Sequence, residues 1–298
     1  MGDKNILHML TPLKHASPFD VNMALDAGFD AVIPYASVER GEITALVQDA
    51  IFSRPPKLGV RTGFFFGGKD ALLGLDMLED ARKAMVPPFA ASLFADPAGS
   101  FTTAAAMVTC VEKVLATKLS RALSGLTVAV FGATGVVGFS SAVIAARQGA
   151  KVILVGYDGP ERVRKAAGEA ARRFDVALGF ADGSSREKIG TLLASAEAAF
   201  CAGRAGVRIL DLEQLRAARS LIVVADVNAV PPAGVDGLQM QANGEPLGDT
   251  SVLGVGPLTI GQLKSKTEAG LFRKMIAAEK PVVFDFRHAF DFARELAK

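Results

Sequence analysis

Short apolar runs alternate with longer amphipathic segments through the first hundred residues. The apolar runs predict strands at residues 6–10, 31–36, 63–66 and 89–94, and the segments between them predict helices around 20–27, 42–52 and 70–85. Regular alternation of this kind is typical of an α/β domain whose sheet is largely parallel. The first third of the chain is therefore predicted to fold as one α/β unit.

The second part of the chain repeats the alternation more sharply. Residues 102–123 have apolar positions close to a helical period, which predicts a helix joining two domains. Further strands are predicted at residues 127–131, 151–155, 176–180, 198–202 and 221–225, and two helical patterns, at 259–278 and 284–296, close the chain. Strands separated by helices of this length indicate a doubly wound parallel sheet.

These patterns predict an α/β protein of two domains. We assign residues 1–104 to an N-terminal α/β domain that binds substrate, and residues 105–283, including the joining helix, to a Rossmann-like domain. The final helix, residues 284–298, is expected to pack back on the first domain. A chain of 298 residues that is 50% hydrophobic and 21% charged is long enough for two such cores.

Charge and cysteine content narrow the possible functions. Lys and Arg number 33 against 31 Asp and Glu, and the basic residues are spread along the chain, whereas nucleic-acid binding needs clustered positive charge. Cys110 and Cys201 lie in apolar runs, so no disulfide is expected. No apolar stretch reaches the length of a membrane span without charge or proline. We expect a cytoplasmic protein and a homo-oligomer, whose subunit number stays open.

A glycine-rich turn follows the strand at 127–131 and precedes a helical segment. Its sequence is Gly-Ala-Thr-Gly-Val-Val-Gly. In a dinucleotide-binding turn Gly132 would permit the bend, Gly135 would let the pyrophosphate approach the backbone, and Gly138 would let the helix pack close to the strand. Other tight strand-to-helix turns use the same spacing, but the strand that follows favours an NAD(P) site. The predicted coenzyme contacts are Gly132, Thr134, Gly135, Val136, Val137 and Gly138.

The residues after the next strand bear on which coenzyme binds. An acid at the strand tip grips the adenine ribose hydroxyls, whereas a small residue leaves room for a 2′-phosphate. Gly156, with Arg162 and Arg164 a few residues later, favours NADP. Asp158, beside Tyr157, favours NAD. The arginines have a second interpretation as an ordinary solvated helix face. We predict NAD, NADP or both as coenzyme, in contact with Gly156, Tyr157, Asp158 and Arg162.

Loops after the later strands are expected beside the nicotinamide. In a doubly wound sheet the ligand lies outside the carboxyl ends of the strands, and small residues there let the ring lie flat. The predicted contacts are Ala202, Gly203, Asp226, Asn228, Gly254 and Gly256. A plain turn explains the last two glycines almost as well.

Polar clusters of the first domain fall where its predicted strands end. They are Ser-Pro-Phe-Asp at 17–20, Phe-Gly-Gly-Lys-Asp at 66–70 and Asp-Pro-Ala-Gly-Ser-Phe-Thr-Thr at 96–103, and they are expected to line a cleft facing the coenzyme. Together with Ala-Asp-Val-Asn-Ala-Val-Pro-Pro at 225–232 and Gly-Val-Gly-Pro-Leu at 254–258, they resemble the methylene-tetrahydromethanopterin dehydrogenases of methylotrophic bacteria. The likeness covers nearly the whole chain in order and spacing.

The resemblance implies an oxidoreductase of one-carbon metabolism. Members of this family transfer a hydride from the methylene bridge of N5,N10-methylene-tetrahydromethanopterin to NAD(P)⁺, which gives the methenyl cation in the oxidation of formaldehyde. Some members also accept methylene-tetrahydrofolate. The donor carbon is activated by two flanking nitrogens, so the reaction requires mainly geometry from the protein and no acid/base triad.

The resemblance also implies residues that bind the pterin. Asp20 and Asp96 are candidates to accept hydrogen bonds from ring N–H and amino donors. Their alternatives, helix N-capping for Asp20 and turn formation for Asp96, stay open. Ser100, Thr102 and Thr103 either bind substrate or cap the joining helix.

A lysine near the pterin is a further implication of the family, in the stretch after a Leu-Gly-x-Gly turn. In this chain the match falls on Lys264 or Lys266 only with a gap. We assign Lys264 the catalytic role, which is to position a carbonyl or a glutamate-like tail. The related folate dehydrogenase/cyclohydrolases use a Tyr-x-x-x-Lys pair, but Tyr35 is followed at that spacing by Glu39, which argues against cyclohydrolase activity.

Two other functions are compatible with the same pattern. One is a shikimate-type or folate-type dehydrogenase, for which Lys69 with Asp96 is the loose candidate acid/base pair. The other is a non-catalytic NAD(P)-binding regulator, which would have no evident use for the polar clusters. No metal site is predicted, because His8, His15 and His288 have no metal-ligand spacing. His15 lies in the loop after the first strand, either at the cleft edge or in solvent.

Overall fold

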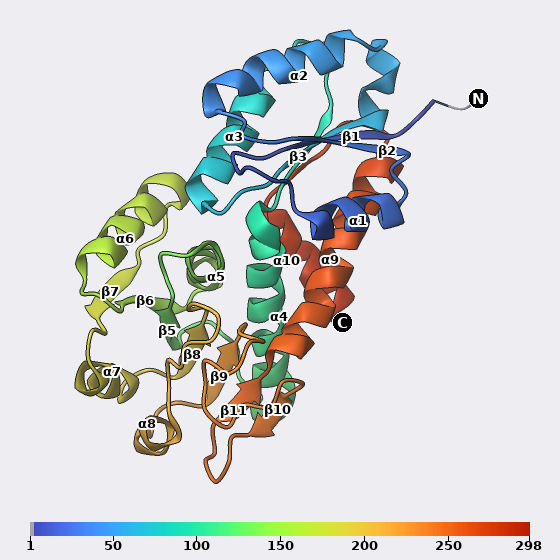
Figure 1. Ribbon diagram of the computed structural model, residues 1–298. Coiled ribbons are helices and arrows are strands. Elements are labelled where there is room, and N and C mark those ends of the chain that lie inside the picture. Colours follow the sequence, from blue (N-terminus) through green and yellow to red (C-terminus); the bar gives the residue numbers. More distant parts are fainter. Residues whose placement is uncertain (1–2) are drawn as a thin grey trace. The chain divides into compact units, whose positions relative to one another are not determined.

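The computed structural model describes residues 3–298 (Figure 1). Contacts between Cα atoms divide the chain into two units, one formed by the residues up to Thr102 with Ser265–Phe292, the other by Thr103–Lys264 with Ala293–Lys298. The helices α4 (Ser100–Leu119) and α9 (Pro257–Ala277) begin in one unit and end in the other. Each unit contains a sheet that is wholly or largely parallel, so the predicted α/β class is confirmed.

The first unit has a sheet with the strand order β12-β4-β3-β1-β2, in which every neighbouring pair is parallel. The strands are β1 (Ile6–Leu10), β2 (Ala31–Tyr35), β3 (Thr62–Phe66), β4 (Ser92–Ala95) and β12 (Val283–Phe284). The helices are α1 (Pro18–Ala27), η1 (Arg40–Glu42), α2 (Ile43–Phe52), η2 (Pro56–Arg61), α3 (Ala71–Lys83) and η3 (Pro97–Gly99). Helices α2 and α3 cover one face of the sheet, and α1 lies on the other (Figure 1).

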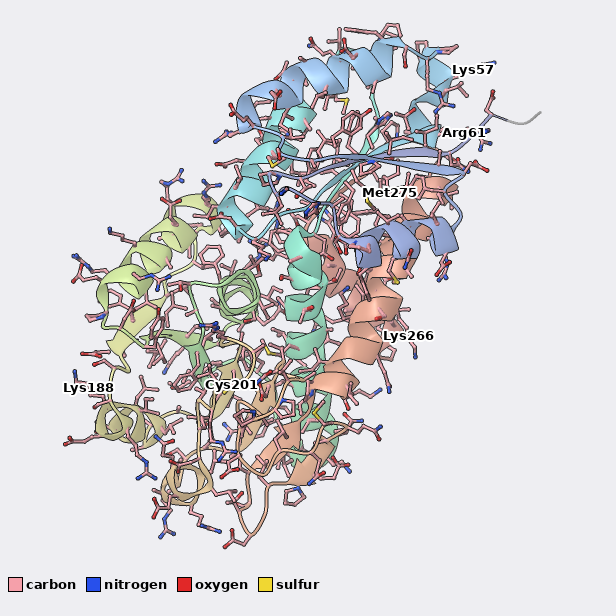
Figure 2. The ribbon with its side chains drawn as sticks, viewed as in Figure 1. Lys57, Arg61, Lys188, Cys201, Lys266 and Met275 are labelled. Atoms are coloured by element: carbon pink, nitrogen blue, oxygen red, sulfur yellow. The ribbon has the colours of Figure 1, made fainter. Side chains whose placement is uncertain are left out.

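The core of the first unit is aromatic. Strand β3 is central and buried along its whole length, and Phe65 is its penultimate residue. On one face, the ring of Phe272 from α9 contacts Phe65 and Phe94, with centroid distances of 5.5 and 5.3 Å. A Cβ at Gly63 would lie 2.8 Å from the Cε atom of Met275, which Figure 2 labels. The glycine therefore lets α9 pack directly on the sheet.

One strand of the first unit starts later than the sequence pattern predicts. The prediction of a strand at residues 89–94 is wrong for its first half, because β4 begins at Ser92. Phe89 instead exchanges backbone hydrogen bonds with Val86 across two prolines, at 2.7 and 3.2 Å. This turn satisfies the Phe89 backbone outside the sheet. Strand β12 has only two residues, which is too short for a hydrophobic pattern to reveal.

The second unit has the strand order β10-β11-β9-β8-β5-β6-β7. The pairs are parallel, apart from β10 with β11. The strands are β5 (Thr127–Phe131), β6 (Lys151–Gly156), β7 (Gly179–Asp182), β8 (Ala198–Cys201), β9 (Val223–Asp226), β10 (Asn243–Pro246) and β11 (Leu253–Val255). The order reverses between β5 and β8, so the predicted doubly wound sheet is confirmed. Ligands of such sheets generally bind at the point of reversal.

The helices of the second unit cover both faces of this sheet. They are α5 (Val136–Arg147), α6 (Glu161–Phe174), α7 (Arg186–Leu193) and α8 (Leu212–Ala217), and α10 (Phe286–Leu296) ends in this unit. Phe139 of α5 contacts Phe174 of α6. Leu193, the last residue of α7, and Leu215 of α8 belong to a core cluster with Phe131. None of the helices in the described part of the chain combines the length and apolar character needed to cross a bilayer.

The third strand of this sheet is also shifted from its predicted place. The pattern put it at residues 176–180, but β7 runs from Gly179, which pairs with Ile153. Asp175 ends α6 with a left-handed φ of 54°, and the next residues form the connection. Val176 and Leu178 are thus apolar without being in a strand. Hydrophobic spacing alone does not separate such a connection from the strand it feeds.

Candidate coenzyme and substrate sites

The glycine turn between β5 and α5 is held by close backbone contacts. Gly132 has a φ of 71°, and a Cβ there would lie 2.1 Å from the carbonyl oxygen of Ala202. A Cβ on Gly138 would lie 2.3 Å from the carbonyl oxygen of Gly132. On Gly135 the nearest atom to a Cβ would be 3.3 Å away. The outer two glycines are therefore required by the backbone, and the middle one keeps the approach to the helix clear.

The N-terminus of α5 is open at this turn. Gly135 is its N-cap residue, in extended conformation, and no side chain accepts a hydrogen bond there. The first backbone N–H groups of the helix are thus left for an external acceptor, with the positive end of the helix dipole behind them. Thr134 and Gly135 are exposed, whereas Val136 is buried. This arrangement suits a pyrophosphate group.

The turn after β6 explains its glycine without reference to a ligand. A Cβ on Gly156 would lie 2.0 Å from the carbonyl oxygen of Gly159, so no side chain fits at this strand tip. Gly156 was interpreted above as room for a 2′-phosphate. The structure gives it a backbone reason instead, so this residue does not by itself indicate NADP.

The two arginines of this region differ in their contacts. Arg162 donates to the Oη of Tyr157 and to Oδ2 of Asp158, both at 3.2 Å, and to Oγ1 of Thr134 at 3.3 Å. Arg164 pairs with Glu161 of its own helix at 2.5 Å. The solvated-helix interpretation therefore fits Arg164. Arg162 instead joins the turn after β6 to the glycine turn.

The end of β9 is organised by a buried carboxylate. Asp226 accepts hydrogen bonds from the backbone N–H groups of Asn228 and Val235, at 2.9 and 3.2 Å. A Cβ on Gly234 would lie 2.8 Å from its Oδ2 atom. Burial raises the pKa of Asp226 above the usual range of aspartate. The carboxylate is turned into the loop that follows β9 and shapes it.

Asn228 has a similar structural task. Its Oδ1 accepts from the N–H groups of Val230 and Gly206, at 2.9 and 3.3 Å, and its Nδ2 donates to the carbonyl of Pro232 at 3.0 Å. The amide thereby ties the loop after β9 to the loop after β8. Asp226 and Asn228 therefore fix the shape of these loops. From the sequence, both residues were expected only to contact the coenzyme.

The remaining small residues near these strand ends also have packing roles. A Cβ on Gly203 would lie 2.7 Å from Cδ1 of Ile209. Gly254 is inside β11, and a Cβ on Gly256 would lie 2.3 Å from the carbonyl oxygen of Gln239. The last two glycines thus let β11 and its end pack against neighbouring backbone and side chains. The plain-turn alternative fits Gly256 but not Gly254, which lies in a strand.

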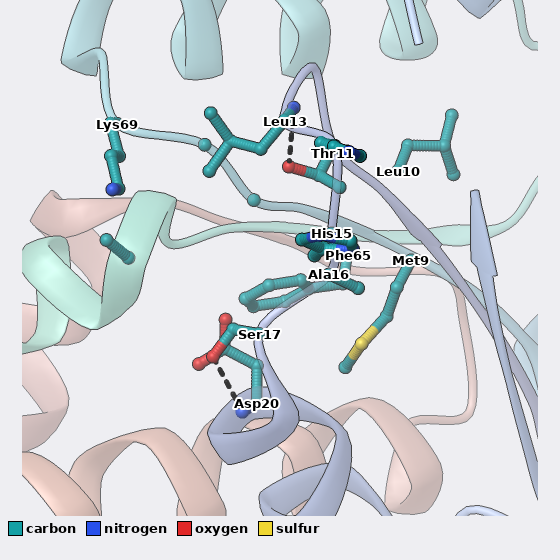
Figure 3. Close-up of a pocket in the computed structure, with 14 residues that line it drawn as sticks. Met9, Leu10, Thr11, Leu13, His15, Ala16, Ser17, Asp20, Phe65 and Lys69 are labelled. Atoms are coloured by element: carbon teal, nitrogen blue, oxygen red, sulfur yellow. Dashed lines mark hydrogen bonds between the residues drawn. The ribbon is translucent and has the colours of Figure 1, made fainter. Parts of the chain in front are cut away.

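The first unit contains a cavity of about 470 Å³ at the carboxyl ends of β1 and β3 (Figure 3). Its lining comes from residues 9–17, the first turn of α1, the loop at 67–69 and Ala98. Thr11, Asp20 and Phe65 form buried parts of this lining, and three basic side chains stand at its exposed rim: Lys14, His15 and Lys69. An acidic and aromatic interior with a basic rim suits a flat polar heterocycle with an anionic extension.

Asp20 and Ser17 divide two tasks at the start of α1. The hydroxyl of Ser17 accepts from the N–H of Asp20 at 3.3 Å, so Ser17 is the helix cap, as Figure 3 shows. The N-capping alternative for Asp20 is therefore wrong. The side chain of Asp20 is 3% exposed and lies in the cavity wall.

For Asp96, in contrast to Asp20, the structural alternative holds. It is fully buried, and its Oδ1 accepts from the N–H groups of Phe101 and Thr102, at 2.7 and 3.2 Å. Its Oδ2 accepts from Oγ1 of Thr102 at 2.6 Å. Asp96 and Thr102 therefore hold the start of α4, and Ser100 contacts the carbonyl of Ala98 at 3.5 Å. Ala98, in the cavity wall, has a left-handed φ of 55° that this tight turn maintains.

Known proteins resemble this chain along its whole length. A family model for the N-terminal part of methylene-tetrahydromethanopterin dehydrogenase matches residues 18–98. An NAD(P)-dependent methylenetetrahydromethanopterin dehydrogenase of Methylorubrum extorquens is 50% identical over 294 residues, which is 99% of each chain. The chain belongs to this family of dehydrogenases. The bifunctional protein MdtA of the same organism is 31% identical over 281 residues, covering 94% of this chain and 95% of the relative.

Solved structures agree with the fold of this dehydrogenase. The NAD-dependent malic enzyme of Thermotoga maritima has a TM-score of 0.59 at 13% identity, covering 97% of this chain and 84% of its own. Shikimate 5-dehydrogenase of Listeria monocytogenes has a TM-score of 0.51 at 14% identity, covering 100% of this chain and 98% of its own. At these identities the likeness concerns the fold alone. The resemblance inferred from the polar clusters and the NAD(P) coenzyme class are confirmed by the family membership.

The two candidate lysines of the dehydrogenase differ in exposure. Lys264 of α9 is 9% exposed, whereas Lys266, labelled in Figure 2, is exposed. Thr103, in the first turn of α4, is half-buried. Three further residues of the cavity lining belong to no motif of the sequence: Thr11, Lys14 and Phe65. The signal for them was their position: Thr11 and Lys14 follow β1, and Phe65 lies near the carboxyl end of β3.

Proposed function

We propose that this enzyme transfers a hydride from methylene-tetrahydromethanopterin to NAD(P)⁺. The observation that carries the proposal is the 50% identity, over 99% of both chains, to an NAD(P)-dependent methylenetetrahydromethanopterin dehydrogenase. The open N-terminus of α5 and the cavity beside Asp20 support it, since they suit a pyrophosphate and a pterin respectively.

In the proposed coenzyme site the protein acts through its backbone. The residues 132–138 supply the bend, the clear approach and the N–H groups that receive the pyrophosphate. The loops after β8 and β9, including Ala202 and Gly203, border the nicotinamide half, and Asp226 with Asn228 keeps those loops in shape. Bound NAD(P)⁺ would supply the hydride acceptor itself.

In the proposed substrate site the interior and the rim of the cavity have different tasks. The carboxylate of Asp20 accepts hydrogen bonds from the N–H and amino donors of the pterin, and Phe65 offers an apolar surface. Lys14 and Lys69 at the rim attract an anionic tail. Lys264 keeps the proposed role of positioning a carbonyl or glutamate-like tail, and Thr103 that of a polar contact.

The reaction then needs no acid or base from the protein. Bound NAD(P)⁺ would accept the hydrogen of the methylene bridge together with both electrons of its C–H bond, and the lone pairs of the two flanking nitrogens would stabilise the resulting methenyl cation. The contribution of the enzyme is to exclude water and to orient the donor and the acceptor.

A spectrophotometric assay tests the proposal. Purified enzyme is mixed with methylene-tetrahydromethanopterin and either NAD⁺ or NADP⁺, and the absorbance of the reduced nicotinamide is followed. Parallel reactions contain methylene-tetrahydrofolate or shikimate. We expect turnover to be fastest with the methanopterin. Preference for shikimate, or binding of NAD(P) without any turnover, would favour one of the alternative functions and overturn the proposal. A cytoplasmic location and a homo-oligomeric state are also proposed, to be tested by cell fractionation and light scattering.

A further inference from the structure

The turn after β6 and the glycine turn are joined by one side chain. Strands β5 and β6 are neighbours in parallel register, with Phe131 opposite Val155, so their carboxyl ends are adjacent. Arg162 reaches across these ends, with Nη2 on Thr134 and Nη1 on both Tyr157 and Asp158. A dinucleotide whose pyrophosphate lies at the glycine turn would place its adenine ribose at this point. Arg162 therefore stands where the two coenzymes differ chemically.

The contacts of Arg162 leave it available to a ligand. Its side chain is 54% exposed and that of Asp158 is 40% exposed, so the ion pair between them, at 3.2 Å, is a weak one in solvent. The guanidinium carbon also lies 5.8 Å from the ring centre of Tyr157, which limits its freedom. A planar guanidinium held in this way is prepared for bidentate binding of a phosphate.

Gly156, at the strand tip itself, has no side chain with which to discriminate between the coenzymes. The turn excludes any side chain at position 156, since a Cβ there would lie 2.0 Å from the carbonyl oxygen of Gly159. The acid that normally grips the ribose hydroxyls is thus displaced to Asp158, where it pairs with Arg162. Selection between the coenzymes falls to this pair.

We propose that the Asp158–Arg162 pair sets the coenzyme preference of the enzyme, a proposal that rests on the proposed function. A free ribose 2′-hydroxyl donates a hydrogen bond to the carboxylate of Asp158, which suits NAD⁺. A 2′-phosphate is repelled by that carboxylate, separates the pair and binds Arg162, which suits NADP⁺. The enzyme accepts both coenzymes because each uses one member of the pair.

Direct binding measurements on the full-length protein test this proposal without the pterin. Affinities for NAD⁺, NADP⁺ and the fragment 2′,5′-ADP are measured by calorimetry for the wild type, Arg162→Gln and Arg164→Gln. Arg162→Gln loses a charge-assisted contact with the phosphate. Its affinity for NADP⁺ and for 2′,5′-ADP is therefore expected to fall about ten- to hundredfold. We expect its NAD⁺ affinity to change less than about threefold. Arg164→Gln, which removes an arginine two positions away that pairs only locally, should match the wild type.

Asp158→Asn provides the reverse test. It keeps a hydrogen-bonding side chain but removes the repulsion, so NADP⁺ binding should tighten while NAD⁺ binding weakens, each by roughly fivefold or more. Equal losses for both coenzymes in Arg162→Gln would mean that the arginine only braces the two turns, and would overturn the proposal. Equal effects of Arg162→Gln and Arg164→Gln on NADP⁺ would also overturn it. If the nucleotides bind as expected but no pterin is oxidised, only the proposed function fails.

Discussion

The glycine turn of the second unit and the polar clusters of the first unit follow different rules. At the glycine turn, residue choice is dictated by backbone: Gly132 and Gly138 have no room for a Cβ, whatever binds nearby. In the clusters, equivalent residues have different tasks. Asp20, in the first turn of α1, lies in a cavity wall, whereas Asp96, directly after β4, caps α4. A backbone requirement can be predicted from the sequence, whereas the role of a polar side chain depends on the residues that surround it in the fold.

The largest effect is expected where the backbone is tightest. In Gly132→Ala the new Cβ would meet the carbonyl of Ala202 at 2.1 Å, at a φ of 71°. We expect a loss of roughly 3 kcal/mol in the free energy of unfolding, from the left-handed backbone and the overlap together. Coenzyme binding should be lost as well. Urea denaturation and calorimetry measure both, and a stable variant with normal affinity would contradict the backbone argument.

Gly135→Leu is the matched control within the same turn. Gly135 has an ordinary φ of −78°, and a Cβ there would lie 3.3 Å from the carbonyl oxygen of Gly132, which requires only a small backbone adjustment. The circular dichroism spectrum should show that the fold is retained. The leucine side chain fills the approach to the helix, so the affinity for the coenzyme should fall by about a hundredfold or more. Normal affinity in this variant would place the pyrophosphate elsewhere.

The same contrast explains how far the sequence alone was informative. The strand–turn–helix order and the doubly wound sheet follow from hydrophobic period and glycine spacing, both local properties. The starts of β4 and β7 do not, because apolar residues also occur in turns such as the one at Phe89. Nor could the sequence reveal that Asp226 and Asn228 shape their loops, since their partners lie up to 22 residues away.

The next prediction separates the two aspartates. Asp96→Ala leaves the N–H groups of Phe101 and Thr102 and the hydroxyl of Thr102 without their buried acceptor. We expect the free energy of unfolding to fall by roughly 3 kcal/mol, combining a lost cap and buried donors. Thermal and urea unfolding check this. Unchanged stability together with a specific loss of pterin binding would restore Asp96 as a substrate ligand.

Asp20→Asn should behave in the opposite way. Ser17 still caps α1, and asparagine keeps the size and one acceptor oxygen of the side chain, so the free energy of unfolding should fall less than in Asp96→Ala. The variant loses a charged acceptor in the cavity, and kcat/KM for the pterin should fall about ten- to hundredfold. Coenzyme affinity, measured by calorimetry, should stay at the wild-type value. A large stability loss with normal kinetics would assign Asp20 to the fold.

The smallest effect concerns the buried carboxylate of the coenzyme loops. Because burial raises the pKa of Asp226, the folded protein holds a proton there more tightly than the unfolded chain does. Its contribution to stability is therefore greatest below the unfolded pKa of aspartate and declines as pH rises through the raised folded pKa. Asp226→Asn carries no such titration, so the stability of the variant relative to the wild type should increase with pH across that window. Urea unfolding at a series of mildly acidic pH values measures the difference. A difference that stays constant, or that reverses its sign, would mean that the loop hydrogen bonds stabilise the charged form enough to cancel the cost of burial.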